Sequence, residues 1–318
     1  MHKALLKASA SVQKVLSSRD IITATSLICC DSEKVPYQSA LEKEEIQSMQ
    51  NAIIGHFSSF PTSGCDLLND VVSTFFILST GCDHWDELLD GGLYSGEVTE
   101  IAGSAGSGKT QVCMSIATSI AMNIEKNVVY IDTQAAFSSE RIKEMLYARD
   151  SSLTGQDTTN ILSRIKCIQA FDVFDVINCL NDIKDSLYME DQGFYSNLRL
   201  VIVDSVAFVI APILGGQQTQ GHSFMVHLSR NLKSLALEHG LSVMVTNNVV
   251  TDTLTIRKVK PALGQTWSHI PNTRIFLQKR ACPVKTNERI ATVVKSSRQP
   301  TDISTTFFIQ TGGLQDYT

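Results

Sequence analysis

The octapeptide "GSAGSGKT", Gly103–Thr110, limits the possible folds of this chain more than any other stretch. It matches the pattern G-x-x-x-x-G-K-S/T in full. The apolar run "EVTEIAG" leads into it, and a helical pattern over 109–123 follows it. A loop between a strand and a helix can surround a phosphate with backbone N–H groups at the positive end of the helix dipole. A chance glycine-rich turn would not have both flanks, so the octapeptide predicts an α/β fold with a nucleotide phosphate site.

The residues of this loop are the predicted ligands of ATP and Mg²⁺. Lys109 is expected to neutralise the β- and γ-phosphates, and the Thr110 hydroxyl is expected to bind Mg²⁺. Asp204 ends the apolar run "LRLVIVDS" and is the second metal candidate, although an acid at such a place can also be a turn or cap residue. The predicted ATP-binding residues are Gly103, Ser104, Ala105, Gly106, Ser107, Gly108, Lys109, Thr110 and Gln111.

Strand and helix patterns alternate over most of the chain. The runs that predict strands are "EVTEIAG", "NVVYID", "IKCIQAF", "LRLVIVDS", "LSVMVTN", "TRIFLQK", "IATVVKS" and "TTFFIQ". Helical patterns occupy 109–123, 138–148, 172–187 and 222–239. Near-continuous apolar strands separated by helices are typical of a parallel sheet with helices on both faces. The last three strands have little helix between them and predict an antiparallel extension.

The remaining residues predict the domain organisation. We expect a small helical N-terminal domain over 1–56, a linker and first strand over 57–77, and the nucleotide-binding domain over 78–318. The first 19 residues contain four basic side chains and no acid. They are either a mitochondrial transit peptide or the first helix of the N-terminal domain. We favour the helix, because the helical pattern continues without a break.

Composition narrows the class of protein. No apolar run approaches the roughly 20 residues that a membrane-spanning helix needs. The eight cysteines have no Cys-x-x-Cys or Cys/His metal spacing, which favours reduced core residues of an intracellular protein. The formal net charge is −5, yet 257–298 carries ten basic residues and one acid, Glu288. Such a basic segment indicates a face that meets a polyanion, or equally a solvated sheet face.

Several stretches, in order along the chain, resemble the ATPase core of RecA-type recombinases of eukaryotes and archaea. They are "STGCDHWDELLDGGLYSGEVTEIAGSAGSGKTQVC", "VVYIDTQAAFSSERI", "LRLVIVDS", "VMVTNNVV" and "KPALGQTWSHIPNTRIFLQK". "AFDVFD", "LGGQQ" and "KSSRQPT" make the chain similar to the D-type paralogues in that family. The resemblance covers about 72–310. It implies a RecA-like P-loop ATPase core that assembles on single-stranded DNA for homologous recombination in the nucleus, with nucleotide between neighbouring subunits.

Two positions depart from the pattern of active recombinases. Gln134 stands where the resemblance implies a glutamate that polarises the attacking water, and Asn248 stands where it implies the γ-phosphate sensor, usually glutamine. An amide can bind a water but cannot accept its proton. With Lys109 these are the candidate catalytic residues, and they predict weak, slow ATP hydrolysis. A carboxylate from elsewhere, such as Glu140 or a residue of a partner subunit, could replace the missing one.

The resemblance also indicates two DNA-facing loops. The first, roughly 213–222, has no Lys or Arg. The second, roughly 249–266, contains Arg257, Lys258 and Lys260, the predicted contacts to single-stranded DNA phosphates. Trp267 either packs in the core or stacks on a base, and packing is favoured.

The linker predicts the kind of partner. Recombinases that form long homofilaments have Phe-x-x-Ala there, but this chain reads Phe57-Ser-Ser-Phe60. A pocket shaped for a methyl group would reject a ring, which favours pairing with sister paralogues in a hetero-oligomer. The two rings could equally hold the linker on the core.

Two other functions remain open. One is a scaffold subunit that ATP stabilises with little or no catalysis. The other is a P-loop GTPase or small-molecule kinase, which ranks last because the sequence has no Asn-Lys-x-Asp motif and no Arg-rich lid.

Overall fold

The computed structural model describes residues 10–18, 21, 24–30, 40–57, 61–189, 193–214, 218–251, 259–280 and 287–316. The chain divides into two compact units, Met1–Asp70 and Val71–Thr318. The domain boundaries predicted at 56 and 77 stay a prediction. No described helix is long and apolar enough to cross a membrane.

The first unit has a small apolar core. Helices α2 (Ala10–Ser17), α3 (Ala24–Ile28) and α4 (Ala40–Phe57) surround it. Its buried residues are Val12, Leu16, Ile21, Leu27 and Ile46. Because α2 contributes Val12 and Leu16, the described part of the basic N-terminal segment forms a helix of this unit.

Helix α5 (Gly64–Thr74) lies in the segment that the sequence predicted as linker and first strand. Ser63 begins it: the Ser63 hydroxyl accepts from the N–H of Asp66 at 3.1 Å and donates to its carboxylate at 2.6 Å. This Ser-x-x-acid pattern is a helix-start signal that the analysis of the linker missed. The Phe57 and Phe60 side chains lie outside the described residues.

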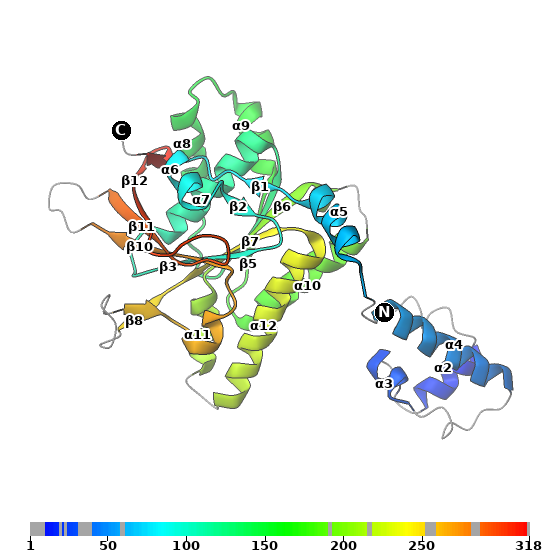
Figure 1. Cartoon of the computed structure of the whole chain (residues 1–318). Coiled ribbons are helices and arrows are strands. Elements are labelled where there is room, and N and C mark those ends of the chain that lie inside the picture. The colour runs from blue at the N-terminus through cyan, green and yellow to red at the C-terminus, as the bar shows by residue number, and fades with distance from the viewer. Residues whose placement is uncertain are drawn as a thin grey trace. The chain divides into compact units, whose positions relative to one another are not determined.

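Nine described strands form the main sheet of the second unit (Figure 1). In spatial order they are β13 (Gly313–Asp316), β12 (Ser304–Gln310), β11 (Glu288–Lys295), β10 (Thr273–Lys279), β3 (Val98–Gly103), β7 (Ser242–Asn247), β6 (Leu198–Asp204), β4 (Asn127–Asp132) and β5 (Ile165–Gln169). From β10 to β5 all neighbours are parallel. From β10 to β13 they are antiparallel. The predicted α/β fold, with an antiparallel extension, is therefore confirmed.

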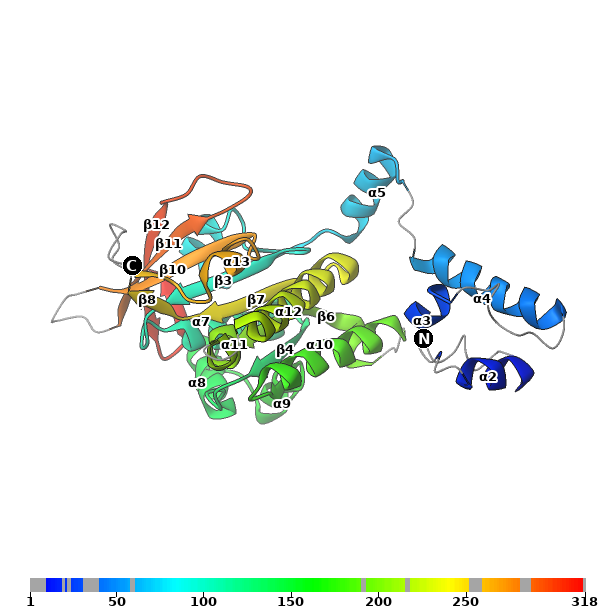
Figure 2. The ribbon, with the colours of Figure 1, turned by 90° about the horizontal axis from the view of Figure 1, so that it is seen from below.

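Helices cover both faces of this sheet. One face is covered by α6 (Asp83–Leu88), α7 (Lys109–Ser119), the π-helical turn η2 (Ile120–Ile124), α8 (Ser139–Arg149) and α9 (Gly155–Ser163). The other is covered by α10 (Val173–Tyr188), α11 (Val206–Leu214), α12 (Gln218–His239) and α13 (Gly264–Ser268). Figure 2 shows α10 and α12 side by side on that second face.

Alternation along the strands builds both cores. In β4, Val128 and Tyr130 belong to one buried cluster, and Val129 and Ile131 belong to the other. Successive side chains of a strand point to opposite faces, so a strand buried on both faces reads as an unbroken apolar run. The helical pattern over 222–239 fails at Leu237, which is 68% exposed.

The parallel strands set the position of the functional site. β3, β4, β6 and β7 run in one direction, so their carboxyl ends meet at one edge of the sheet. Two short antiparallel pairs complete the described strands: β1 (Ile77–Leu78) with β2 (Leu93–Tyr94), and β8 (Val249–Thr251) with β9 (Val259–Pro261). The second pair follows β7 directly at this edge.

Candidate nucleotide-binding site

The glycine-rich loop joins the end of β3 to the first residue of α7. Gly106 and Gly108 have φ values of 73° and 106°, a left-handed region that glycine adopts without strain. A Cβ on Gly108 would lie 2.3 Å from the Cδ1 of Ile309. Glycine takes this path without strain, and at Gly108 a side chain would also meet Ile309.

Lys109 lies at the start of α7 and folds over its own loop. Its Nζ donates to the carbonyl oxygens of Gly103, at 2.8 Å, and Ser104, at 3.2 Å. Burial lowers the pKa of Lys109, and the nearby Asp204 carboxylate opposes that shift. The ammonium group is thus held at the cavity by two carbonyl oxygens of its own loop.

Asp204 is a buried carboxylate with three hydroxyl donors. Thr110 donates to its Oδ2 at 2.7 Å, and Tyr130 donates to the same oxygen at 2.8 Å. Thr246 donates to Oδ1. Burial raises the pKa of Tyr130 well above its ordinary value, so the phenol stays protonated and continues to donate. The pair of Thr110 and Asp204 offers oxygen ligands of the kind that Mg²⁺ prefers.

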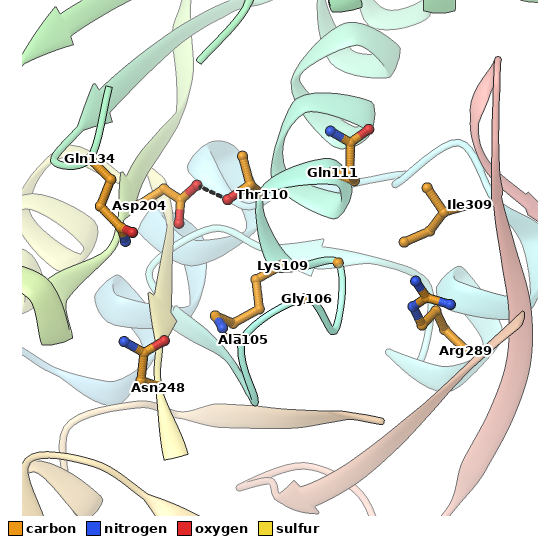
Figure 3. A pocket seen from close by; sticks show the side chains of 11 residues that line it. Ala105, Gly106, Lys109, Thr110, Gln111, Gln134, Asp204, Asn248, Arg289 and Ile309 are labelled. Carbon is orange, nitrogen blue, oxygen red and sulfur yellow. Dashed lines mark hydrogen bonds between the residues drawn. The ribbon is translucent and has the colours of Figure 1, made fainter. Parts of the chain in front are cut away.

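Gln134 enters the same cavity from the loop after β4 (Figure 3). Its Nε2 donates to the hydroxyl of Ser205 at 3.0 Å. The nearby Asp132 does not line the cavity: its two oxygens accept from the backbone N–H groups of Gln134 and Phe137 at 3.0 and 2.9 Å. Asp132 therefore shapes the loop that carries Gln134.

Glu140, the candidate replacement for the missing carboxylate, does not line the cavity. It is exposed in the first turn of α8, where its carboxylate accepts from the hydroxyls of Ser138 and Ser139. Its own backbone N–H, with these hydroxyls, lowers its pKa. Among the described residues that line the cavity, the one acid is Asp204.

The cavity has a volume of about 440 Å³, within the usual range for small-molecule sites. It is lined by Ala105, Gly106, Gly108, Lys109, Thr110, Gln111, Gln134, Asp204, Asn248, Arg289 and Ile309. Figure 3 shows these side chains. The structure thus brings most of the predicted site residues together, and Gly103, Ser104 and Ser107 form the rest of the loop behind them.

Arg289 and Ile309 are the lining residues that the sequence analysis missed. Arg289 lies on β11, and its Nε donates to the carbonyl of Ser107 at 3.0 Å. Burial lowers its pKa. Ile309 lies on β12 and faces Gly108. Neither residue belongs to a sequence motif. Only the pairing of strands in the antiparallel extension of the sheet brings them to the loop.

The predicted DNA contacts are less fully described. Lys260 is exposed on β9, while Arg257 and Lys258 lie outside the described residues. The indole of Trp267 is fully buried and donates to Glu100 at 2.9 Å. The packing interpretation of Trp267 is therefore correct, and it has no face for a base.

Comparison with known proteins gives consistent matches. Residues 72–317 match the family model described as Rad51. The chain is 38% identical over 289 residues to DNA repair protein RAD51 homolog 4 of Bos taurus, covering 91% of this chain and 88% of the relative. The Mus musculus protein of that name is 37% identical, covering 95% and 92%. The crystal structure of the RadB recombinase is similar with a TM-score of 0.63 and 26% identity, covering 76% of this chain and all of that one.

The support of Asp204 can be tested with Tyr130→Phe, which removes one hydroxyl donor and keeps the ring. We expect the free energy of unfolding to fall by about 1–3 kcal/mol, because a buried charged acceptor loses a partner. Chemical denaturation measures this. The control is Tyr195→Phe, whose hydroxyl accepts from exposed Lys166 and should change stability by less than about 0.5 kcal/mol. Equal small effects would show that Tyr130 does not hold Asp204.

Proposed function

The chain belongs to the Rad51 family, and on that premise we propose that it binds ATP with Mg²⁺, hydrolyses it slowly, and acts on single-stranded DNA with sister paralogues. Members of this family are ATPases that bind ATP with Mg²⁺. The relatives named above are DNA repair proteins. Recombinational DNA repair in the nucleus is the setting that this membership supports.

One observation carries the nucleotide part of the proposal. Thr110 is the second residue of α7 and Asp204 ends β6, yet their side chains are joined by a 2.7 Å hydrogen bond beside Lys109 (Figure 3). Phosphate oxygens would meet the loop N–H groups and the Lys109 ammonium. Mg²⁺, held at Thr110 and Asp204, would offset the charge of the β- and γ-phosphates. The donor set and the glycine conformations fit this ligand.

Slow turnover follows from the lack of a second acid among the described residues that line the cavity. Asp204 has three hydroxyl donors and is assigned to the metal, so Gln134 is the lining side chain left to orient a water. Its amide oxygen can accept a hydrogen bond but not a proton. We infer that this chain keeps nucleotide for longer than a recombinase with glutamate at this position.

The DNA and partner parts of the proposal rest on different support. Lys260 is exposed on β9, which lies within the basic second loop. The family resemblance supplies the rest, including hetero-oligomer formation. The alternative is a scaffold that ATP stabilises with little or no catalysis. The amide of Gln134 in place of a carboxylate is also consistent with this alternative. Lys109→Arg separates the two, since a scaffold tolerates lost hydrolysis as long as assembly survives.

Nucleotide binding is tested by calorimetry on the full chain with ATP, ADP and Mg²⁺. We expect Lys109→Ala to weaken ATP binding at least about tenfold, because a charge-assisted contact to phosphate is lost. The matched control is Lys143→Ala, which removes an exposed lysine on α8. Wild-type protein that takes up neither nucleotide, alone or with sister paralogues, would overturn the proposal.

Gln134→Glu tests the cause of slow hydrolysis. A carboxylate at this position should raise the turnover number by about 10²-fold or more, the usual contribution of a general base. Steady-state phosphate release with single-stranded DNA present is the measurement. Gln111→Glu is the control: Gln111 also lines the cavity but accepts from Arg141 at 3.0 Å. If neither variant is faster, Gln134 does not explain the rate.

The second loop is tested by reversing its charges. The triple variant Arg257→Glu, Lys258→Glu and Lys260→Glu should bind single-stranded DNA more weakly and with a shallower salt dependence, because fewer counterions are released. Fluorescence anisotropy over a salt series measures both quantities. The control reverses three exposed lysines elsewhere: Lys43, Lys143 and Lys166. Unchanged affinity in the loop variant would remove this loop as the contact.

A further inference from the structure

The end of β7 contacts two different regions through its two faces. Thr246 donates to Asp204, and Asn248, two residues later, lines the nucleotide cavity. Asn247 lies between them and bonds in a different place, to Glu100 at 2.6 Å. Alternation along the strand therefore directs one face to the candidate metal pair and the other to a separate polar cluster.

Glu100 is the centre of that cluster. It lies on β3, three residues before the glycine-rich loop, and none of it is exposed. Its Oε1 accepts from Asn247 and from the indole of Trp267 at 2.9 Å, and its Oε2 accepts from the guanidinium of Arg274. A buried carboxylate is costly unless such donors surround it. These donors come from β7, α13 and β10.

The cluster is also bonded to the second loop itself. Asn247 Nδ2 donates to the carbonyl of Ala262 at 3.1 Å, and the N–H of Ala262 donates to the carbonyl of Asn248 at 2.8 Å. Ala262 directly follows β9, where Lys260 pairs with Val250. The backbone of the cavity residue Asn248 is thus held by a residue two positions from the predicted DNA contact.

Stability alone does not account for this cluster. The Oδ1 of Asn247 and one guanidinium nitrogen of Arg274 are buried without a partner among the described residues, and each such group costs free energy. Well-packed apolar residues in place of a buried ion pair are often as stable or more so. The chain also buries the other indole, Trp85, with no partner for its N–H, so a buried indole here does not require a carboxylate.

We propose that Glu100 is a positioning residue: through Asn247 and Trp267 it holds Asn248 in register with the β8–β9 hairpin, and so couples γ-phosphate recognition to DNA binding. The proposal rests on the proposed function, since it assumes nucleotide in the cavity. Glu100 itself does not line the cavity. We assign its effect on the nucleotide to the position of Asn248.

Trp267→Phe tests the coupling, because it removes the donor to Glu100 and keeps an aromatic ring. The readout is the ratio of the dissociation constants of ADP and a non-hydrolysable ATP analogue, with and without single-stranded DNA. We expect this ratio, and its response to DNA, to fall about threefold or more, the usual size of a coupling change, while ADP affinity stays the same. Glu100→Gln should act in the same direction.

The matched control is Trp85→Phe, which alters a second fully buried indole without breaking a described hydrogen bond. It should lower the melting temperature and leave the ratio unchanged. Equal ratios in both tryptophan variants and in wild type would overturn the positioning role, while nucleotide binding by wild type would leave the proposed function standing. Absence of any nucleotide binding by wild type would overturn both.

A measurement on wild-type protein tests the coupling even when the variants do not fold. The N–H of Ala262 and the indole N–H of Trp267 should exchange with solvent several-fold more slowly with the ATP analogue than with ADP, because only the analogue has a γ-phosphate for Asn248 to contact. Equal exchange with both nucleotides would contradict the coupling.

Discussion

The buried carboxylate of Asp204 is the interaction on which the rest of the site depends. It accepts from hydroxyls on α7, β4 and β7, so it joins the glycine-rich loop to two other strands. A charge this deeply buried is stable only when donors surround it. That requirement fixes the carboxyl ends of β4, β6 and β7 relative to one another. The position of the cavity follows from it.

The sequence could predict the part of the site that lies at the ends of strands or within a few residues of them. Lys109, Thr110, Gln134 and Asp204 each follow an apolar run, and parallel strands bring such ends to one edge. Arg289 could not be found in this way. It is the second residue of an antiparallel strand, and only the pairing order of the sheet puts it beside the loop.

The fold was predicted in its strong periodic parts and missed where local signals compete. The capping pattern at Ser63 was overlooked because Pro61 and Gly64 indicated a linker. Leu237 is exposed although Ala236 before it and Leu241 after it are buried, because its position five residues after Leu232 turns its side chain to the other side of α12. An apolar residue inside a helix therefore belongs to the core only when its spacing matches that of the other buried positions.

Strand β7 carries the metal support and the hairpin contact on alternate residues, and this arrangement makes the strand sensitive to length. Most single substitutions there would affect one face only. Inserting or deleting one residue before Thr246 would exchange the faces, turning Asn247 toward Asp204 and Thr246 toward Glu100. The spacing of Thr246, Asn247 and Asn248 is therefore a stricter requirement on the gene than the chemistry of any one of them.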